Sequence, residues 1–233
     1  MDPKGLAAIV TGAASGLGAE TAVHLARAGV KVACLDINLN GARETAEKIG
    51  GVAIRCDVTS SDNAEAALKE ARDKHGPARI LINCAGVGPA RRMVGRDGPM
   101  PLAEFEKIIA VNLTGTFNMM RLCAADMQNL PPFADGERGV IVSTASVAAY
   151  EGQIGQAPYA ASKGGVAALT IPVARELSQF GIRVMAIAPG IFGTPMLKAL
   201  PQAAQDSLGA SVSRANMPIS CCSSCAAAIS TAR

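Results

Sequence analysis

Short apolar runs alternate with amphipathic segments along most of this 233-residue chain. Residues 6–11 and 31–36 form the first two runs, and helical patterns at 16–28 and 39–49 follow them. Runs that are apolar throughout, each followed by a helix, indicate a parallel sheet with helices on both faces. We therefore expect an α/β fold built on a single Rossmann-like, doubly wound sheet. Pro172 predicts a kink or an early end of the last helix. The later strands are expected at 52–56, 80–83, 139–145 and 182–188, and the later helices at 61–75, 102–129 and 157–179.

Composition and charge limit the function classes. Hydrophobic residues make up 49% of the chain, enough for one domain with a substantial core. The net charge is +3 and the charged residues are scattered, so neither a nucleic-acid groove nor a polybasic membrane patch is indicated. No uninterrupted apolar run reaches the roughly 18 residues of a membrane span, and residues 1–4 lead into a strand rather than a secretory signal. We expect a cytoplasmic protein with no nucleic-acid or membrane partner.

The seven cysteines and two histidines show no disulfide or metal-ligand spacing. Cys34, Cys56, Cys84 and Cys123 lie singly in apolar surroundings, as small core residues do. The other three cysteines lie within residues 221–225, where one C-x-x-C motif has no second pair of ligands. We therefore expect no metal site.

The first strand runs into a glycine-rich segment, Thr11–Gly18, which reads T-G-A-A-S-G-L-G. Glycines there allow a tight turn and close backbone approach, and the following helix presents free N–H groups to a phosphate. Such a turn is weak evidence alone, and its spacing differs from the commoner G-x-G-x-x-G. Asp36 ends the second strand, where its carboxylate either accepts hydrogen bonds from a ribose and repels the extra phosphate of NADP, or caps the next helix. Together these features point to NAD.

Tyr159 and Lys163 lie four residues apart in the last helical pattern, with Ser146 thirteen positions before the tyrosine. Four residues apart on a helix, the two side chains share one face. A nearby ammonium favours a phenolate, so we expect Lys163 to lower the pKa of Tyr159 from about 10 and make it a proton donor or acceptor. Ser146 would offer its hydroxyl to the same substrate oxygen. The alternative is a buried ring and a solvated charge that share this spacing by chance.

These motifs, taken in order, resemble the short-chain dehydrogenase/reductase family. The likeness covers residues 5–210, so we expect an NAD-binding domain at 1–210 and an atypical Cys-, Ser- and Ala-rich tail at 211–233. Within the family, segments 142–153 and 188–196 are most similar to the type 2 3-hydroxyacyl-CoA dehydrogenases, which also oxidise some hydroxysteroids. The motifs are Thr11–Gly18, Asn83-Cys84-Ala85-Gly86, Asn112 in V-N-L-T-G, Ser146, Tyr159, Lys163 and Pro189-Gly190.

The resemblance implies a role for each matching position. Tyr159 matches the catalytic acid/base, Lys163 the residue that holds the nicotinamide ribose, and Ser146 the hydroxyl that orients the substrate. Asn112 matches a catalytic residue that holds a water between the lysine and solvent. From the residues alone, Asn112 and Asp57 would be ordinary turn or cap residues. The implied cofactor contacts are Gly12, Ser15, Gly16, Leu17, Gly18, Asp36, Asp57, Val58, Asn83, Ala85, Gly86, Tyr159, Lys163, Pro189, Gly190 and Thr194, and the implied substrate contacts are Ser146, Gln153 and Tyr159.

The implied reaction is hydride transfer between NAD and a secondary alcohol, with 3-hydroxyacyl-CoA and 3-oxoacyl-CoA as the expected pair. Arg91, Arg92 and Arg96 either attract the phosphates of an acyl-CoA or lie in a solvated loop. The alternatives are a hydroxysteroid dehydrogenase and a 3-oxoacyl-carrier-protein reductase, which Asp36 disfavours because such enzymes usually prefer NADPH. An alternative of another class is an inactive cofactor-binding scaffold that its altered tail has disabled.

From residue 211 the chain departs from the family pattern, which continues with a helix and a final strand. We hypothesise that this altered tail does not form that strand, which would leave 182–188 at an exposed sheet edge and remove one of two tetramer interfaces. Helices 102–129 and 157–179 correspond to the other interface. A homodimer is therefore expected rather than a tetramer.

Overall fold

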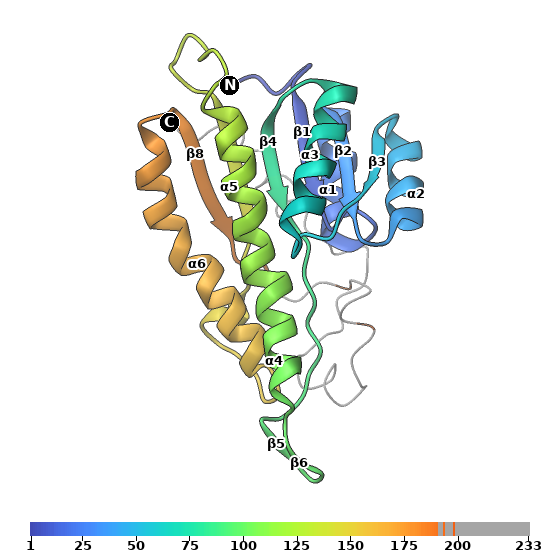
Figure 1. The fold of residues 1–233 in the computed structure, drawn as a ribbon, viewed down its shortest axis with the longest axis vertical. Coiled ribbons are helices and arrows are strands. Elements are labelled where there is room, and N and C mark those ends of the chain that lie inside the picture. The colour runs from blue at the N-terminus through green and yellow to red at the C-terminus, as the bar shows by residue number, and fades with distance from the viewer. Residues whose placement is uncertain (191–192, 194–197, 199–233) are drawn as a thin grey trace.

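The computed structural model describes residues 1–190, 193 and 198, and these contain a six-stranded parallel sheet (Figure 1). Its strand order is β3-β2-β1-β4-β7-β8. The chain thus builds outward in one direction from β1, then returns and builds in the other from β4, as expected for a doubly wound sheet. In such folds ligands bind beyond the carboxyl ends of the strands, where the order reverses. The strands are β1 (Ala7–Thr11), β2 (Lys31–Asp36), β3 (Val52–Arg55), β4 (Ala78–Asn83), β7 (Gly139–Thr144) and β8 (Ile182–Ile187).

Two apolar clusters cover the two faces of the sheet. One joins Leu81 and Ile141 of the strands to helices α3, α5 and α6, and the other joins Val10 and Val32 to α1 and α2. These central strands are buried along most of their length, which explains why their sequences are apolar rather than alternating. The helices are α1 (Gly16–Arg27), α2 (Leu39–Ile49), α3 (Ser61–His75), α4 (Leu102–Ile109), α5 (Gly115–Met127) and α6 (Ala157–Ser178).

A π-helix, Ala110–Thr114, separates α4 from α5 where the sequence predicts one continuous helix at 102–129. Single π-turns of this kind often occur at functional sites. This one carries Asn112, whose side chain is fully buried. The helical period of the sequence gives no sign of this interruption.

The stretch Leu102–Met127 is long and apolar enough to cross a membrane by length and composition. Half of its most apolar window is buried inside the protein, as in a core helix. The window includes polar residues, which is why it does not read as an uninterrupted apolar run.

Helix α6 continues past Pro172 to Ser178, so of the kink or early end predicted at this proline, the early end is wrong, and the helix spans nearly all of the predicted 157–179. Val166 on the near side of the proline is fully buried, and Leu169 and Val173 pack against the core on either side of it. This packing outweighs the hydrogen bond that the proline removes.

A short antiparallel hairpin, β5 (Val94–Gly95) and β6 (Gly98–Pro99), extends beyond the start of α4 (Figure 1). The sequence suggests a loop at this position, not a hairpin. At the other side of the sheet, β8 is the edge strand within the described part of the chain. The tail at 211–233 lies outside the described residues, so its predicted alteration stays a prediction.

Two adjacent glycines of α6 test how closely this helix approaches the π-helix. A Cβ at Gly165 would lie 2.7 Å from Leu113 Cδ2, whereas a Cβ at Gly164 would meet its nearest neighbour, the Ala149 oxygen, at 4.0 Å. Gly165→Ala should lower the free energy of unfolding by about 1–3 kcal/mol through overpacking. Gly164→Ala should leave it unchanged or raise it by about 0.5–1 kcal/mol, because alanine favours helix. Urea unfolding measures both, and equal effects would contradict this packing.

Candidate active site

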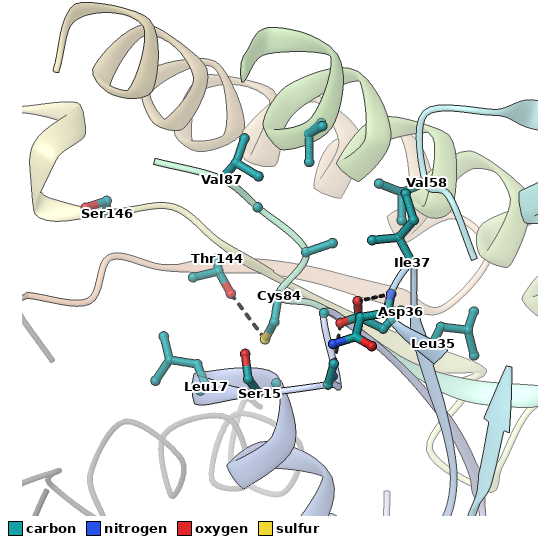
Figure 2. A pocket seen from close by; sticks show the side chains of 18 of the residues that line it. Ser15, Leu17, Leu35, Asp36, Ile37, Val58, Cys84, Val87, Thr144 and Ser146 are labelled. Atoms are coloured by element: carbon teal, nitrogen blue, oxygen red, sulfur yellow. Dashed lines mark hydrogen bonds between the residues drawn. The ribbon is translucent and has the colours of Figure 1, made fainter. Parts of the chain in front are cut away.

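A cavity of about 570 Å³ opens at the carboxyl ends of the central strands. Its walls come from the segments after all six strands of the parallel sheet, from α4 and the π-helix, and from the first two turns of α6. Figure 2 shows Asp36 near one end and Ser146 at the other. The sequence-predicted residues that line it are Gly12, Ser15, Gly16, Leu17, Gly18, Asp36, Asp57, Val58, Ala85, Gly86, Ser146, Tyr159, Lys163, Pro189 and Gly190.

The glycine-rich loop lies at the floor of this cavity, where β1 gives way to α1. Gly18 is buried, and a Cβ there would lie 2.2 Å from the Gly12 carbonyl oxygen, so a side chain would disrupt the loop. Ser15, the residue before α1, has an extended backbone, and its side chain makes no capping hydrogen bond. The first N–H groups of α1 therefore face a cavity wide enough for a phosphate, which suits the predicted pyrophosphate site.

Asp36 is held in place by two backbone N–H groups. Ala14 N donates to its Oδ2 at 3.0 Å and Asn38 N to its Oδ1 at 2.9 Å. Each carboxylate oxygen has a second acceptor position. The side chain thus fixes the loop and also offers acceptors to ribose hydroxyls at this end of the cavity.

Asp57 lines the cavity and also makes the turn before α3. Its Oδ1 accepts hydrogen bonds from Thr59 N at 3.0 Å and Thr59 Oγ1 at 2.7 Å. Asp57 therefore makes a turn, as the residues alone suggest, and also lines the cavity, as the resemblance implies.

Lys163 is buried, with 4% of its surface exposed, although its side chain ends in an amine. Its Nζ donates to the Thr144 carbonyl oxygen at 2.6 Å and lies 5.8 Å from the centre of the Tyr159 ring. Burial lowers the pKa of Lys163 to about 8, and the electrostatic interaction with Cys84 opposes this shift.

The phenol of Tyr159 faces the cavity from the first turn of α6. Burial raises the pKa of Tyr159, and a hydrogen bond with the Ser146 side chain opposes the rise. The predicted lowering of this pKa by Lys163 is therefore wrong, because burial raises the pKa and Lys163 is not among the groups that oppose the rise. Tyr159 holds its proton at neutral pH and is suited to donating it.

Asn112 does not line the cavity, but its side chain forms hydrogen bonds that connect the segments around it. Its Oδ1 accepts from Val87 N at 2.8 Å, and its Nδ2 donates to Val87 O at 2.8 Å and to Ser162 Oγ at 3.0 Å. Ser162 Oγ in turn donates to the Tyr159 carbonyl oxygen at 2.7 Å. The π-helix is thus linked to the turn of α6 that carries the tyrosine. Sequence reasoning missed Ser162, although a small polar residue directly before the lysine was a signal.

Besides Asn112, three predicted residues are not part of the cavity lining that the structure describes. Asn83 is buried and its Nδ2 donates to Ser143 Oγ at 3.2 Å, so it joins β4 to β7. Gln153 is exposed and borders a second cavity. Thr194 lies outside the described residues.

Cys84, which the sequence places in the core, is half-buried on the cavity lining (Figure 2). Its Sγ accepts from Thr144 Oγ1 at 3.6 Å. Lys107 and Val111, from α4 and the π-helix, also line the cavity and were missed. Cys84 follows β4 and Thr144 ends β7, and a position at the carboxyl end of a parallel strand was the available signal. Nothing in the sequence singles out Lys107.

The family model of short chain dehydrogenases matches residues 6–205. The chain is 46% identical over 203 residues to the human 3-hydroxyacyl-CoA dehydrogenase type-2, covering 85% of this chain and 78% of the relative. It is 45% identical over 213 residues to the Drosophila melanogaster protein of the same name, covering 90% and 84%. A crystal structure of 3-hydroxyacyl-CoA dehydrogenase type-2 from Mycobacterium avium superposes with a TM-score of 0.83 at 38% identity, covering 97% of this chain and 90% of that one.

The chain therefore belongs to the short-chain dehydrogenase family. It is an oxidoreductase that uses a nicotinamide cofactor and acts on a small molecule. Among known proteins, it is similar to the 3-hydroxyacyl-CoA dehydrogenases of type 2.

The link from Asn112 through Ser162 to Tyr159 can be tested with two serines of α6. Ser178 Oγ donates to the Arg175 oxygen at 2.8 Å, the same kind of bond to residue i−3 that Ser162 makes, but at the far, exposed end of the helix. Ser162→Ala should lower stability by about 1–3 kcal/mol, because the buried Asn112 Nδ2 loses an acceptor. It should also lower kcat more than it changes KM. Ser178→Ala should do neither, and matched losses would argue against the link.

Proposed function

We propose that the protein is an NAD-dependent dehydrogenase that interconverts 3-hydroxyacyl-CoA and 3-oxoacyl-CoA. One observation carries the proposal: Tyr159, Ser146 and the buried Lys163 line a single cavity together with the glycine-rich loop and Asp36. The names of the relatives support this choice of substrate.

In this proposal a different group of cavity residues binds each part of NAD. The glycine-rich loop and the start of α1 hold the pyrophosphate, and Asp36 accepts from the adenosine ribose. Asp57 and Val58 border the adenine, and Ala85 and Gly86 the adenosine side. Lys163 holds the nicotinamide ribose, with Pro189 and Gly190 beside the ring. The cofactor supplies or accepts the hydride.

The protein moves the proton. During ketone reduction the Tyr159 hydroxyl donates its proton to the substrate oxygen, and Ser146 Oγ donates a hydrogen bond to the same atom. The raised pKa of Tyr159 keeps this donor protonated at neutral pH. Alcohol oxidation requires the phenolate instead, so it should accelerate as the pH rises toward that pKa.

We also propose a homodimer. Helices α4, α5 and α6 carry exposed large apolar residues, Phe105, Phe117 and Ile171 among them. Such residues are a feature of faces that pair with another protein surface. Sedimentation equilibrium measures the mass directly.

The direct test of the reaction is NADH consumption with acetoacetyl-CoA. Tyr159→Phe should abolish turnover by removing the proton donor while NADH still binds. The chain contains two tyrosines, so Tyr150→Phe is the matched control: Tyr150 is exposed and lies outside the cavity. Turnover by Tyr159→Phe at the normal rate, or NADH binding without turnover by the natural protein, would refute the proposed reaction.

Cofactor choice is tested at Asp36. Asp36→Asn removes the charge but keeps the shape and an acceptor oxygen, so the repulsion of the 2′-phosphate disappears. The ratio of kcat/KM for NADH to that for NADPH should fall by about tenfold or more, which corresponds to the loss of roughly 1.4 kcal/mol of discrimination. A protein that prefers NADPH before the substitution would contradict the choice of NAD.

A further inference from the structure

Arg55, the last residue of β3, lies beside Asp36, the last residue of β2. The two are register partners in the parallel β2–β3 pairing, so they occupy neighbouring strands that lie about 4.8 Å apart. Figure 1 shows β3 at the outer side of the sheet, next to α2. The proposed function gives a role to Asp36 and none to Arg55.

The two side chains belong to the same face of the sheet. Cys34 and Ala53, two positions earlier in β2 and β3, both pack in the apolar cluster that contains α1 and α2. Because side chains alternate along a strand, Asp36 and Arg55 lie on this same face. The hydrogen bond that Asp36 accepts from Ala14 N, in the turn before α1, agrees with this placement.

The guanidinium of Arg55 is available to a ligand. Arg55 is exposed and forms no ion pair with any residue that the structure describes. Solvent borders it, because β3 is an edge strand in the described part of the sheet. The Asp36 carboxylate, in contrast, is fixed by its two backbone N–H partners. An adaptable cation therefore stands beside a fixed anion at the adenosine end of the cavity.

A phosphate on the 2′-oxygen of the adenosine ribose is the group that would meet both charges. Asp36 accepts from the ribose hydroxyls in the proposed function, so a 2′-phosphate would lie against its carboxylate. Asn38, whose N donates to Asp36, precedes α2, and the first turn of α2 contains no acidic residue. The positive end of this helix and a guanidinium that can bind two phosphate oxygens both favour such a phosphate, whereas Asp36 opposes it.

We propose that Arg55 attracts the 2′-phosphate that Asp36 repels, so that these two neighbouring charges together set the choice between NAD and NADP. The inference rests on the proposed function, because it concerns the same cofactor site. While Asp36 is charged, NAD stays the preferred cofactor and Arg55 reduces the margin of that preference. When the charge of Asp36 is removed, Arg55 becomes the residue that binds the 2′-phosphate.

Equilibrium binding of NADH and NADPH, followed by nicotinamide fluorescence, tests this role without relying on turnover. Asp36→Asn should bind NADPH about tenfold or more tightly than the natural protein does. Asp36→Asn/Arg55→Ala should lose about tenfold or more of that NADPH affinity, because a hydrogen bond between two charged groups is removed. NADH affinity should change little between these two variants, since NADH lacks the 2′-phosphate. Arg55→Ala alone should weaken NADPH binding and leave NADH binding unchanged.

Lys31 provides the matched control. It begins the strand that Asp36 ends, is exposed, and forms no ion pair with any residue in the described part of the chain. Asp36→Asn/Lys31→Ala therefore removes one positive charge about 17 Å from Asp36, at the opposite end of β2. Its NADPH affinity should equal that of Asp36→Asn.

Equal NADPH affinities of Asp36→Asn and Asp36→Asn/Arg55→Ala would overturn the role of Arg55, and the proposed cofactor would stand if the natural protein still prefers NADH. An equal loss in the Lys31 control, or no gain of NADPH affinity in Asp36→Asn, would also overturn it. A natural protein that prefers NADPH and loses this preference in Arg55→Ala would support Arg55 and refute the choice of NAD. Binding of neither nucleotide by the natural protein would refute both proposals.

Discussion

The bond from the Lys163 ammonium to the Thr144 carbonyl oxygen is the contact around which the rest of the site is arranged. It places a long basic side chain in the interior and fixes α6 against the end of β7. Burying an amine is costly unless its hydrogen bonds are satisfied, and the lowered pKa of Lys163 reflects that cost. A second connection, from Asn112 through Ser162 to the Tyr159 carbonyl, secures the same turn of the helix from the side of the π-helix.

These two connections determine where the proton-carrying groups lie. Tyr159 reaches the cavity from the turn that both connections hold, and Ser146 meets it from the segment after β7. Because the phenol is desolvated, its pKa is raised, so the site favours the protonated donor at neutral pH. The same arrangement leaves the other end of the cavity to Asp36 and the glycine-rich loop, which is the geometry that an extended dinucleotide requires.

Much of this could be predicted from the sequence, because the responsible signals are local. Continuous apolar runs predicted the parallel strands, the glycine-rich turn predicted the start of α1, and the four-residue spacing of Tyr159 and Lys163 placed both on one cavity wall. The π-helix was missed because a single wide turn leaves the apolar period almost intact. The direction of the Tyr159 pKa was wrong because desolvation depends on tertiary packing that spacing does not reveal. Cys84 looked like a core residue because its neighbours in sequence are apolar, yet its position just beyond β4 turns it to the cavity.

Burial at the end of β7 sets the proton chemistry of Tyr159, and this effect can be measured directly. The chain has no tryptophan and two tyrosines, so in a Tyr150→Phe background the near-ultraviolet absorbance of tyrosinate reports Tyr159 alone. Burial predicts that this residue titrates above the ordinary tyrosine value of about 10 while the protein is folded, returns to about 10 on unfolding in urea, and titrates still higher after Ser146→Ala. Titration of folded Tyr159 at or below the unfolded value would contradict it.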